Sequence, residues 1–248
     1  MLSDLLTFLA IGFAAQLVDG AIGMAYGLTS TTVLLSVGVP PAMASASVHA
    51  AEVFTTGASA LSHWRLGNVD GKLFWRLALP GAVGGAVGAF LLTELPGDKV
   101  QPFVSAYLGI MGAVVLWKAL RQNRGDGQPP RNVPLLGFAG GFLDAIGGGG
   151  WGPMVASTLV GRGMKTRLAI GSTNAAEFLV TTTISAMFVF TIGLELWPII
   201  TGLILGGVIA APLAAYTTRA LPDRPLMILV GVVIIILSLR GLFQAFGN

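Results

Sequence analysis

The sequence has no cysteine, few histidines and few charged residues. Only 10% of its 248 residues are Asp, Glu, Lys or Arg, whereas a soluble domain carries about 25%. Without cysteine the chain cannot form disulfide bonds or use thiolate chemistry. Its two histidines, His49 and His63, do not form an HExxH metal-binding motif, and the sequence contains no phosphate-binding GxxxxGKS or GxxxxGKT loop. We therefore expect no enzyme activity, no catalytic residues, no metal site and no cofactor.

Hydrophobic residues, in contrast, make up 54% of the chain. Runs of about 20 apolar residues have the length that a helix needs to cross the hydrocarbon of a bilayer. The sequence therefore predicts an all-α integral membrane protein, with lipid as a partner. The net charge of +3 does not indicate a nucleic-acid partner, because most basic residues lie in short loops between apolar runs. The predicted spans are 42–62, 73–93, 102–118, 168–190, 196–218 and 225–247.

The two halves of the chain are related by an internal repeat. DGAIGMAYG at 19–27 matches DAIGGGGWG at 144–152, and SVHAAEVFTT at 47–56 matches STNAAEFLVT at 172–181, all at the same offset. A polar segment rich in glycine and proline separates the halves, as expected of a linker. The predicted organisation is a first membrane repeat at 1–120, a cytoplasmic linker at 121–131 and a second membrane repeat at 132–248.

The loop charges predict how each half crosses the membrane. All Lys and Arg residues except Lys99 and Arg240 lie in four loops, at 63–76, 118–131, 161–167 and 219–224. If these loops are cytoplasmic, the segments at 5–35 and 133–160 each begin and end on one side. Each repeat is then a re-entrant helical hairpin plus three transmembrane helices, and the odd number of crossings inverts one repeat relative to the other. The alternative is eight ordinary spans.

The glycine-rich breaks after Asp19 and Asp144 are the predicted binding site. Inside a bilayer, non-helical backbone is tolerated only where protein or a water-filled cavity satisfies its polar groups. Exposed glycine N–H groups and the positive end of the following helix suit a small anion. The candidate substrate-binding residues are Gly23, Ser47, His49, Gly148, Gly149, Gly150, Trp151, Ser172, Thr173 and Asn174.

These candidates also have purely structural interpretations. Glycines allow membrane helices to pack closely, which we favour for Gly84, Gly85, Gly88, Gly206 and Gly207. Serine and threonine in membrane helices commonly bond to their own backbone. Trp151 fits either a cavity wall or a packing role.

Four carboxyl groups in apolar sequence are the other notable feature. Ionisable groups in membrane spans are costly and usually face a cavity or a partner. Such groups could couple transport to protons, with His49 one helical turn before the first glutamate. They could equally cap the N–H groups of a broken helix. These proton-coupling or structural acids are Asp19, Glu52, Asp144 and Glu177.

The segments DAIGGGGWGPM at 144–154, DGAIGMAYG at 19–27, SVHAAEVFTTGASALSHWRLGNVD at 47–70 and STNAAEF at 172–178 resemble the sulfite exporter TauE/SafE family. The resemblance implies a multi-pass secondary transporter of the bacterial cytoplasmic (inner) membrane that exports a small sulfur-containing oxyanion such as sulfite or a sulfonate. Proton coupling is an option. The alternatives are a channel-like anion uniporter and a non-transport membrane scaffold. Exposed small-residue faces also suggest a homodimer.

Overall fold

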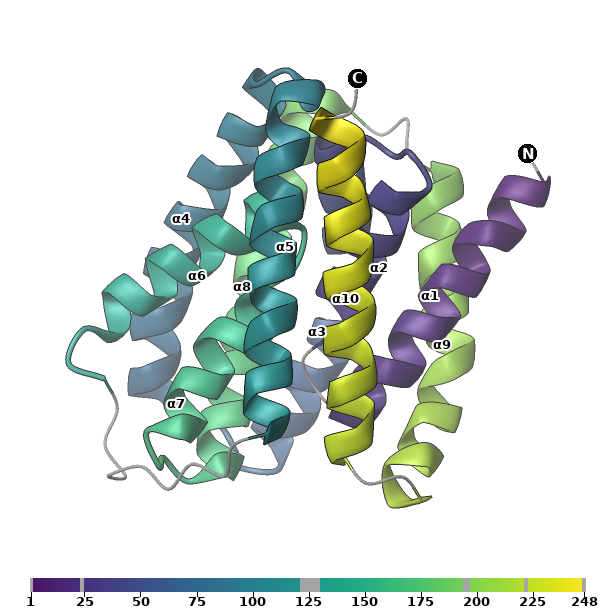
Figure 1. The fold of residues 1–248 in the computed structure, drawn as a ribbon. Coiled ribbons are helices and arrows are strands. Elements are labelled where there is room, and N and C mark those ends of the chain that lie inside the picture. The colour runs from purple at the N-terminus through teal and green to yellow at the C-terminus, as the bar shows by residue number, and fades with distance from the viewer. Residues whose placement is uncertain (1, 23–24, 121–129, 194–196, 221–222, 247–248) are drawn as a thin grey trace.

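The computed structural model describes residues 2–22, 25–120, 130–193, 197–220 and 223–246, and these residues form helices and short connections with no strand (Figure 1). The all-α expectation is confirmed. The helices are α1 (Leu2–Ile22), α2 (Tyr26–Ser36), α3 (Pro41–Arg65), α4 (Gly71–Glu94), α5 (Gly97–Leu120), α6 (Val133–Gly147), the π-helix η1 (Gly152–Ala156), α7 (Ser157–Gly161), α8 (Thr166–Ile192), α9 (Trp197–Ala220) and α10 (Asp223–Phe246).

Three of the described helical segments are long and apolar enough to cross a membrane. They are Gly71–Glu94, Gly97–Leu120 and Arg167–Ile192, which correspond to the predicted spans at 73–93, 102–118 and 168–190. Shorter apolar stretches lie at Trp197–Ala210 and Met227–Phe243, within α9 and α10. Helix α3 has 25 residues, and its sequence includes histidine, glutamate and several serines and threonines. This polar content makes α3 the least lipid-like of the long helices.

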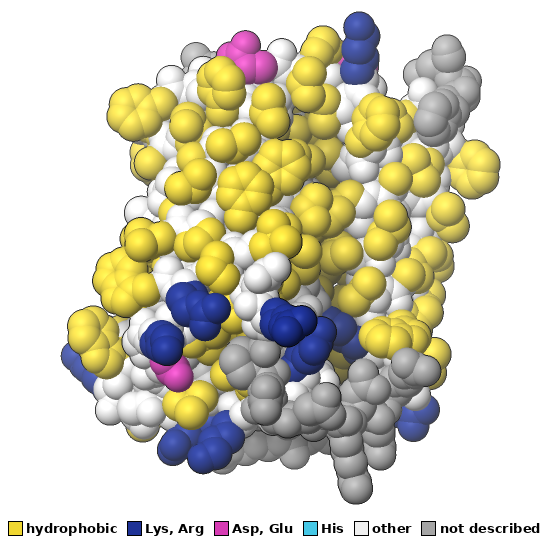
Figure 2. Space-filling view, turned by 90° about the vertical axis from the view of Figure 1, so that its left-hand side faces the viewer, with side chains coloured by type: hydrophobic (Ala, Val, Ile, Leu, Met, Phe, Trp, Pro, Cys, Tyr) yellow, Lys and Arg dark blue, Asp and Glu magenta, His cyan; other side chains and the backbone are white. Residues whose placement is uncertain are grey.

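The outside of the molecule is apolar. Large hydrophobic side chains are exposed on many helices, and Phe190, Phe243 and Phe103 are each at least 75% exposed. Figure 2 shows hydrophobic side chains spread over one face, with Lys and Arg side chains gathered mainly toward its lower end. A soluble protein rarely exposes apolar patches of this extent. The surface is therefore that of a multi-pass membrane protein.

Two helices are interrupted, at the positions where the repeat places its glycines. In Figure 1, α2 runs back toward the upper end of the molecule, where α1 begins, and α7 runs back toward the lower end. At the second break Gly148 has φ +64° in the left-handed region, and Gly149 and Gly150 have φ +153° and +152°. Side chains rarely adopt this backbone conformation, so the break depends on glycine.

Interfaces between the halves are built on glycine. Helix α1 packs against α9, α4 against α6, α3 against α8 and α5 against α10. A Cβ on Gly84 would lie 2.1 Å from the Phe138 carbonyl oxygen, and one on Gly206 would lie 2.1 Å from the Leu9 carbonyl oxygen. These glycines therefore serve close helix packing, as do Gly85 and Gly88, whereas a Cβ on Gly207 would meet nothing nearer than 3.7 Å.

Candidate functional site

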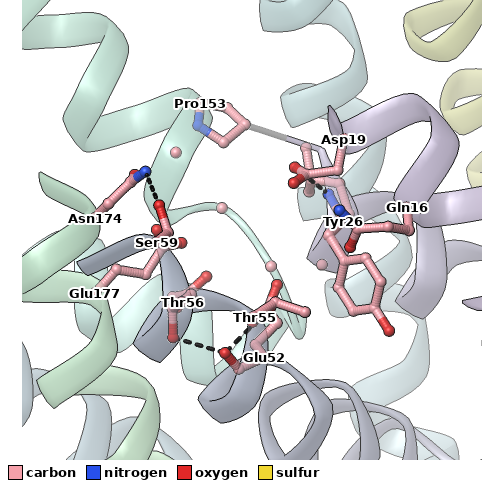
Figure 3. Close-up of a pocket in the computed structure, with 16 residues that line it drawn as sticks. Gln16, Asp19, Tyr26, Glu52, Thr55, Thr56, Ser59, Pro153, Asn174 and Glu177 are labelled. Carbon is pink, nitrogen blue, oxygen red and sulfur yellow. Dashed lines mark hydrogen bonds between the residues drawn. The ribbon is translucent and has the colours of Figure 1, made fainter. Parts of the chain in front are cut away.

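A cavity of about 250 Å³ lies where the two breaks meet α3 and α8 (Figure 3). Its polar walls come from both halves of the chain, so neither repeat forms it alone. The residues that line it are Gln16, Asp19, Tyr26, Gly27, Leu28, Glu52, Thr55, Thr56, Ser59, Asp144, Gly149, Gly150, Gly152, Pro153, Asn174 and Glu177.

The acid before each break accepts hydrogen bonds from the backbone after it. The Asp19 Oδ1 atom accepts from the Ala25 N–H at 2.7 Å and from the Tyr26 N–H at 3.0 Å. The Asp144 Oδ1 atom accepts from the Trp151 N–H at 3.0 Å. Both breaks share a spacing of seven residues between acid and donor, which makes the two sites equivalent. Each carboxyl therefore satisfies N–H groups that have no partner inside their own helix.

His49 joins α3 to the second acid. Its Nδ1 atom lies 2.8 Å from the Ser45 carbonyl oxygen, and its Nε2 atom lies 3.3 Å from Asp144 Oδ2. A carbonyl oxygen can only accept, so Nδ1 carries a hydrogen. One further proton between Nε2 and Oδ2 then completes the second bond, and it resides on either His49 or Asp144. Both side chains are buried, so they share this proton away from bulk water.

The two breaks touch each other directly. A Cβ on Gly149 would lie 2.3 Å from the Gly27 carbonyl carbon, which is closer than any side chain can approach. The hydroxyl of Thr31, on α2, donates to the Gly148 carbonyl, and the Tyr107 hydroxyl, on α5, donates to the Gly149 carbonyl at 3.2 Å. Side chains of the first half therefore hold the irregular backbone of the second.

Helices α3 and α8 provide the opposite wall of the cavity. The Asn174 amide donates to the Ser59 hydroxyl at 2.9 Å, joining the two helices beside the cavity (Figure 3). Glu52 is buried, with a carboxyl oxygen close to Gly27, and Glu177 is partly buried. Among the described residues, no Lys, Arg or His side chain lines this cavity. No group of three or more acidic or histidine side chains in the described chain is arranged as a metal site.

The predicted site residues separate into two groups. Gly149, Gly150, Asn174 and the four acids line the cavity, and His49 contacts it through Asp144. Gly148 belongs to the second break, and Gly23 lies outside the described residues.

The remaining candidates make structural contacts away from the cavity. The hydroxyls of Ser47 and Thr173 donate to carbonyls of their own helices, and Ser172 accepts from the Asp70 N–H. Trp151 is fully buried, and its ring lies against Gly81 and Gly140. None of these four side chains lines the cavity.

Several lining residues were not predicted from the sequence. Thr55, Thr56 and Ser59 lie three, four and seven residues after Glu52, the spacing that places side chains on one helix face. Gln16 precedes Asp19 by three residues, on the same face of α1. The spacing of these residues from Glu52 and Asp19 could therefore have identified them as lining residues from the sequence. The unpredicted lining residues are Gln16, Tyr26, Gly27, Leu28, Thr55, Thr56, Ser59, Gly152 and Pro153.

A helical protein with an apolar exterior and a polar cavity at interrupted helices belongs to the class of multi-pass membrane transporters. The particular family follows from comparison with known proteins: residues 8–241 match the sulfite exporter TauE/SafE family, and the chain belongs to it. The resemblance read from the sequence motifs is thereby confirmed.

Two relatives carry transporter names. The chain is 41% identical over 253 residues to the probable membrane transporter protein YtnM of Bacillus subtilis (strain 168), covering 98% of this chain and 84% of that protein. It is 29% identical over 150 residues to the probable membrane transporter protein ORF9 of a Sinorhizobium species, covering 56% of each. No solved structure matches the chain. The family and these relatives indicate that the chain is a membrane transporter.

Proposed function

We propose that this protein is a secondary transporter of the bacterial cytoplasmic membrane that exports a small sulfur-containing oxyanion, such as sulfite or a sulfonate, through the cavity between the two breaks. The observation that carries the proposal is the direct contact of the two breaks beside that cavity, at Gly27 and Gly149. The name of the family supplies the substrate class. Export of an anion from a negative-inside cell is downhill by about 2.3 kcal/mol per charge per 100 mV.

The proposal includes two inverted repeats, 1–120 and 132–248, joined by a cytoplasmic linker at 121–131. Helix α2 and the segment Gly152–Gly161 are each about 15 Å long, half of the roughly 30 Å hydrocarbon thickness. They are too short to cross, which supports re-entrant hairpins over eight ordinary spans.

The packing of the helices also supports a two-fold relation between the repeats. By sequence, α1 corresponds to α6 and α4 to α9. The α1–α9 and α6–α4 interfaces are therefore the same interface with the halves exchanged. Helices α3 and α8 correspond to each other and pack together, as do α5 and α10. A pseudo-two-fold axis produces this pattern, and it is the arrangement of inverted-repeat transporters.

The four carboxyl groups make protonation part of the proposed mechanism. An anion beside several ionised carboxylates, in surroundings of low dielectric constant, is strongly repelled. Protonated carboxyls instead offer O–H donors to an oxyanion. Binding of the anion then requires that Asp19, Glu52 and Glu177 carry protons, and the proton shared by His49 and Asp144 lies beside them. This supports proton coupling of transport.

The proposal is tested with the purified full chain in proteoliposomes loaded with sulfite. We expect saturable sulfite efflux that is strongly reduced by Asn174→Ala, because Asn174 offers an uncharged donor at the cavity wall. Counterflow driven by unlabelled sulfite distinguishes a carrier from a channel-like uniporter. Absence of flux for sulfite and for short sulfonates, together with no thermal stabilisation by any of them, would overturn the proposal in favour of a scaffold.

A further inference from the structure

A second cavity, of about 370 Å³, lies between the C-terminal turns of α5 and the segment formed by η1 and α7. We call it the basic pocket. The elements that line it, the end of α5 and α7, lie toward the lower end of Figure 1. Its lining residues are Met111, Val114, Trp117, Lys118, Pro153, Met154, Ser157, Thr158, Gly161 and Arg162.

The charge of the basic pocket is opposite to that of the central cavity. Lys118 and Arg162 are the charged residues in its lining, and none of the acids that line the central cavity is part of it. An ammonium group has three donors and a guanidinium has five. The Pro153 carbonyl takes one donor of Lys118, so others remain for a ligand. The Ser157 and Thr158 hydroxyls donate to carbonyls of their own segment, which leaves the two cations as the main donors.

We propose that the basic pocket binds an oxyanion, held by Lys118 and Arg162 and separate from the central cavity. Charge-assisted hydrogen bonds from lysine and arginine to oxyanions are the strong ones in proteins. The oxyanion group can come from a free anion on the linker side or from a phospholipid headgroup, since both present the same phosphate-like or sulfite-like oxygens.

The basic pocket is connected to the central cavity through one residue. Pro153 lines both cavities, and its carbonyl accepts the Lys118 hydrogen bond. It lies in a π-helix, a type of segment that occurs frequently at functional sites. An oxyanion in the basic pocket would bind the same Lys118 ammonium group that donates to this carbonyl, so its binding is linked to the wall of the central cavity. The role of the basic pocket as the entry site for exported anions rests on the proposed function.

The experiment measures binding of inorganic sulfate to the purified full chain in detergent without added phospholipid, by titration calorimetry and by tryptophan fluorescence. Trp117 lines the pocket and reports locally, so the fluorescence change should disappear in Trp117→Phe while the calorimetric signal remains. We expect sulfate binding to weaken about tenfold or more in Arg162→Gln and in Lys118→Gln. Arg162 is exposed, so its replacement tests the site without disturbing the fold.

Two control variants separate this site from others. Lys165→Gln removes an exposed basic residue of the same loop that does not line the pocket, and it should leave sulfate affinity unchanged. Asn174 lines the central cavity and not the basic pocket, so Asn174→Ala should also retain sulfate binding. Sulfate binding in the basic pocket without sulfite flux would support the basic pocket and contradict the proposed function. The two proposals can therefore fail independently.

A lipid arm identifies the source of the oxyanion. If phosphatidylglycerol added to the micelles displaces sulfate from the wild type, and Arg162→Gln weakens that displacement, the oxyanion site is supported with a headgroup as its occupant. If phosphatidylglycerol does not displace sulfate, and Arg162→Gln still weakens sulfate binding, the occupant is a free anion. The proposal is overturned if Arg162→Gln weakens the binding of neither sulfate nor phosphatidylglycerol. It is also overturned if Asn174→Ala alone abolishes sulfate binding.

Discussion

His49 is the residue with the most specific surroundings in the described chain. Its ring lies between the Ser45 carbonyl and the Asp144 carboxyl, and it reaches no solvent. Because Nδ1 lies against the Ser45 carbonyl, Nε2 is the ring nitrogen that faces Asp144. Asp144 in turn holds the Trp151 N–H at the start of the π-helix. The His49–Asp144 pair is therefore joined to the backbone that borders the cavity.

His49→Gln should reduce the pH dependence of transport, because glutamine cannot exchange a proton with Asp144, while the part due to Asp19, Glu52 and Glu177 should remain. Binding should remain measurable, since His49 does not line the cavity. The measurement is efflux of a sulfonate, whose own charge stays constant over the physiological pH range, from proteoliposomes at several pH values. His63→Gln is the matched control, because His63 contacts Asn68 at the end of α3, away from the cavity. An unchanged pH profile in His49→Gln would contradict a role for this pair.

Gly149→Ala should prevent the two breaks from touching. The new Cβ would meet the Gly27 carbonyl carbon and the Leu28 nitrogen, both at 2.3 Å, and the φ of +153° is unfavourable for alanine. Overpacking typically costs about 1–3 kcal/mol, so we expect a lower thermal midpoint in detergent and strongly reduced efflux. Gly161→Ala is the control, because a Cβ there meets nothing within 4 Å. Equal stability of the two variants would show that the close approach of the breaks is not needed.

At the scale of helices, glycines decide which surfaces meet. Helix α4 approaches α6 at Gly84 and Gly88, where a Cβ would collide with carbonyl oxygens of Phe138 and Phe142. Such backbone proximity replaces the hydrophobic driving force, which is weak between helices in lipid. These interfaces position the second break, because α6 leads directly into it.

Gly84→Ala should loosen the α4–α6 interface, because its Cβ would lie 2.1 Å from the Phe138 carbonyl oxygen. We expect a destabilisation of about 1–3 kcal/mol, measured as a lower thermal midpoint of the purified protein. Gly207→Ala, where the nearest atoms are at 3.7 Å, should change the midpoint little. A Gly207→Ala variant that is as unstable as Gly84→Ala would mean that glycine content, rather than close packing, determines the effect.

At the scale of the whole molecule, the proposed inversion of the repeats has a direct topological consequence. The connection after α2 and the connection after α7 should lie on opposite sides of the membrane, whereas eight ordinary spans with parallel halves place them on the same side. The absence of native cysteine allows single-cysteine labelling without a background.

Val37→Cys and Lys165→Cys should be labelled by a membrane-impermeant maleimide from opposite faces of intact cells and inverted vesicles. Both positions are exposed in the structure, and neither requires the positive φ of the neighbouring Gly38 and Gly163. Labelling of both cysteines from one face would rule out the inverted arrangement and, with it, the opposed hairpins of the proposed site.

Local sequence patterns predicted the class of fold, because the distribution of apolar residues along a chain depends on whether lipid or water surrounds it. Apolar runs identified three helices that are long enough to cross the membrane, α4, α5 and α8, since the length of a crossing helix follows from bilayer thickness. The glycine-rich stretches after Asp19 and Asp144 correctly marked the two breaks, because glycine adopts backbone conformations that interrupt a helix. The same local information could not assign Trp151, whose surroundings are Gly81 and Gly140 on other helices.

The sequence alone therefore determined that the chain is a helical membrane protein, that it belongs to one transporter family and that two of its helices are broken after an acid. Only the tertiary structure decided that the two breaks touch, that four carboxyls share one cavity and that Lys118 and Arg162 line another. The reason is that these neighbours come from segments far apart in the chain. A helix's own sequence indicates which face is polar, but the partner of that face depends on how all helices pack together.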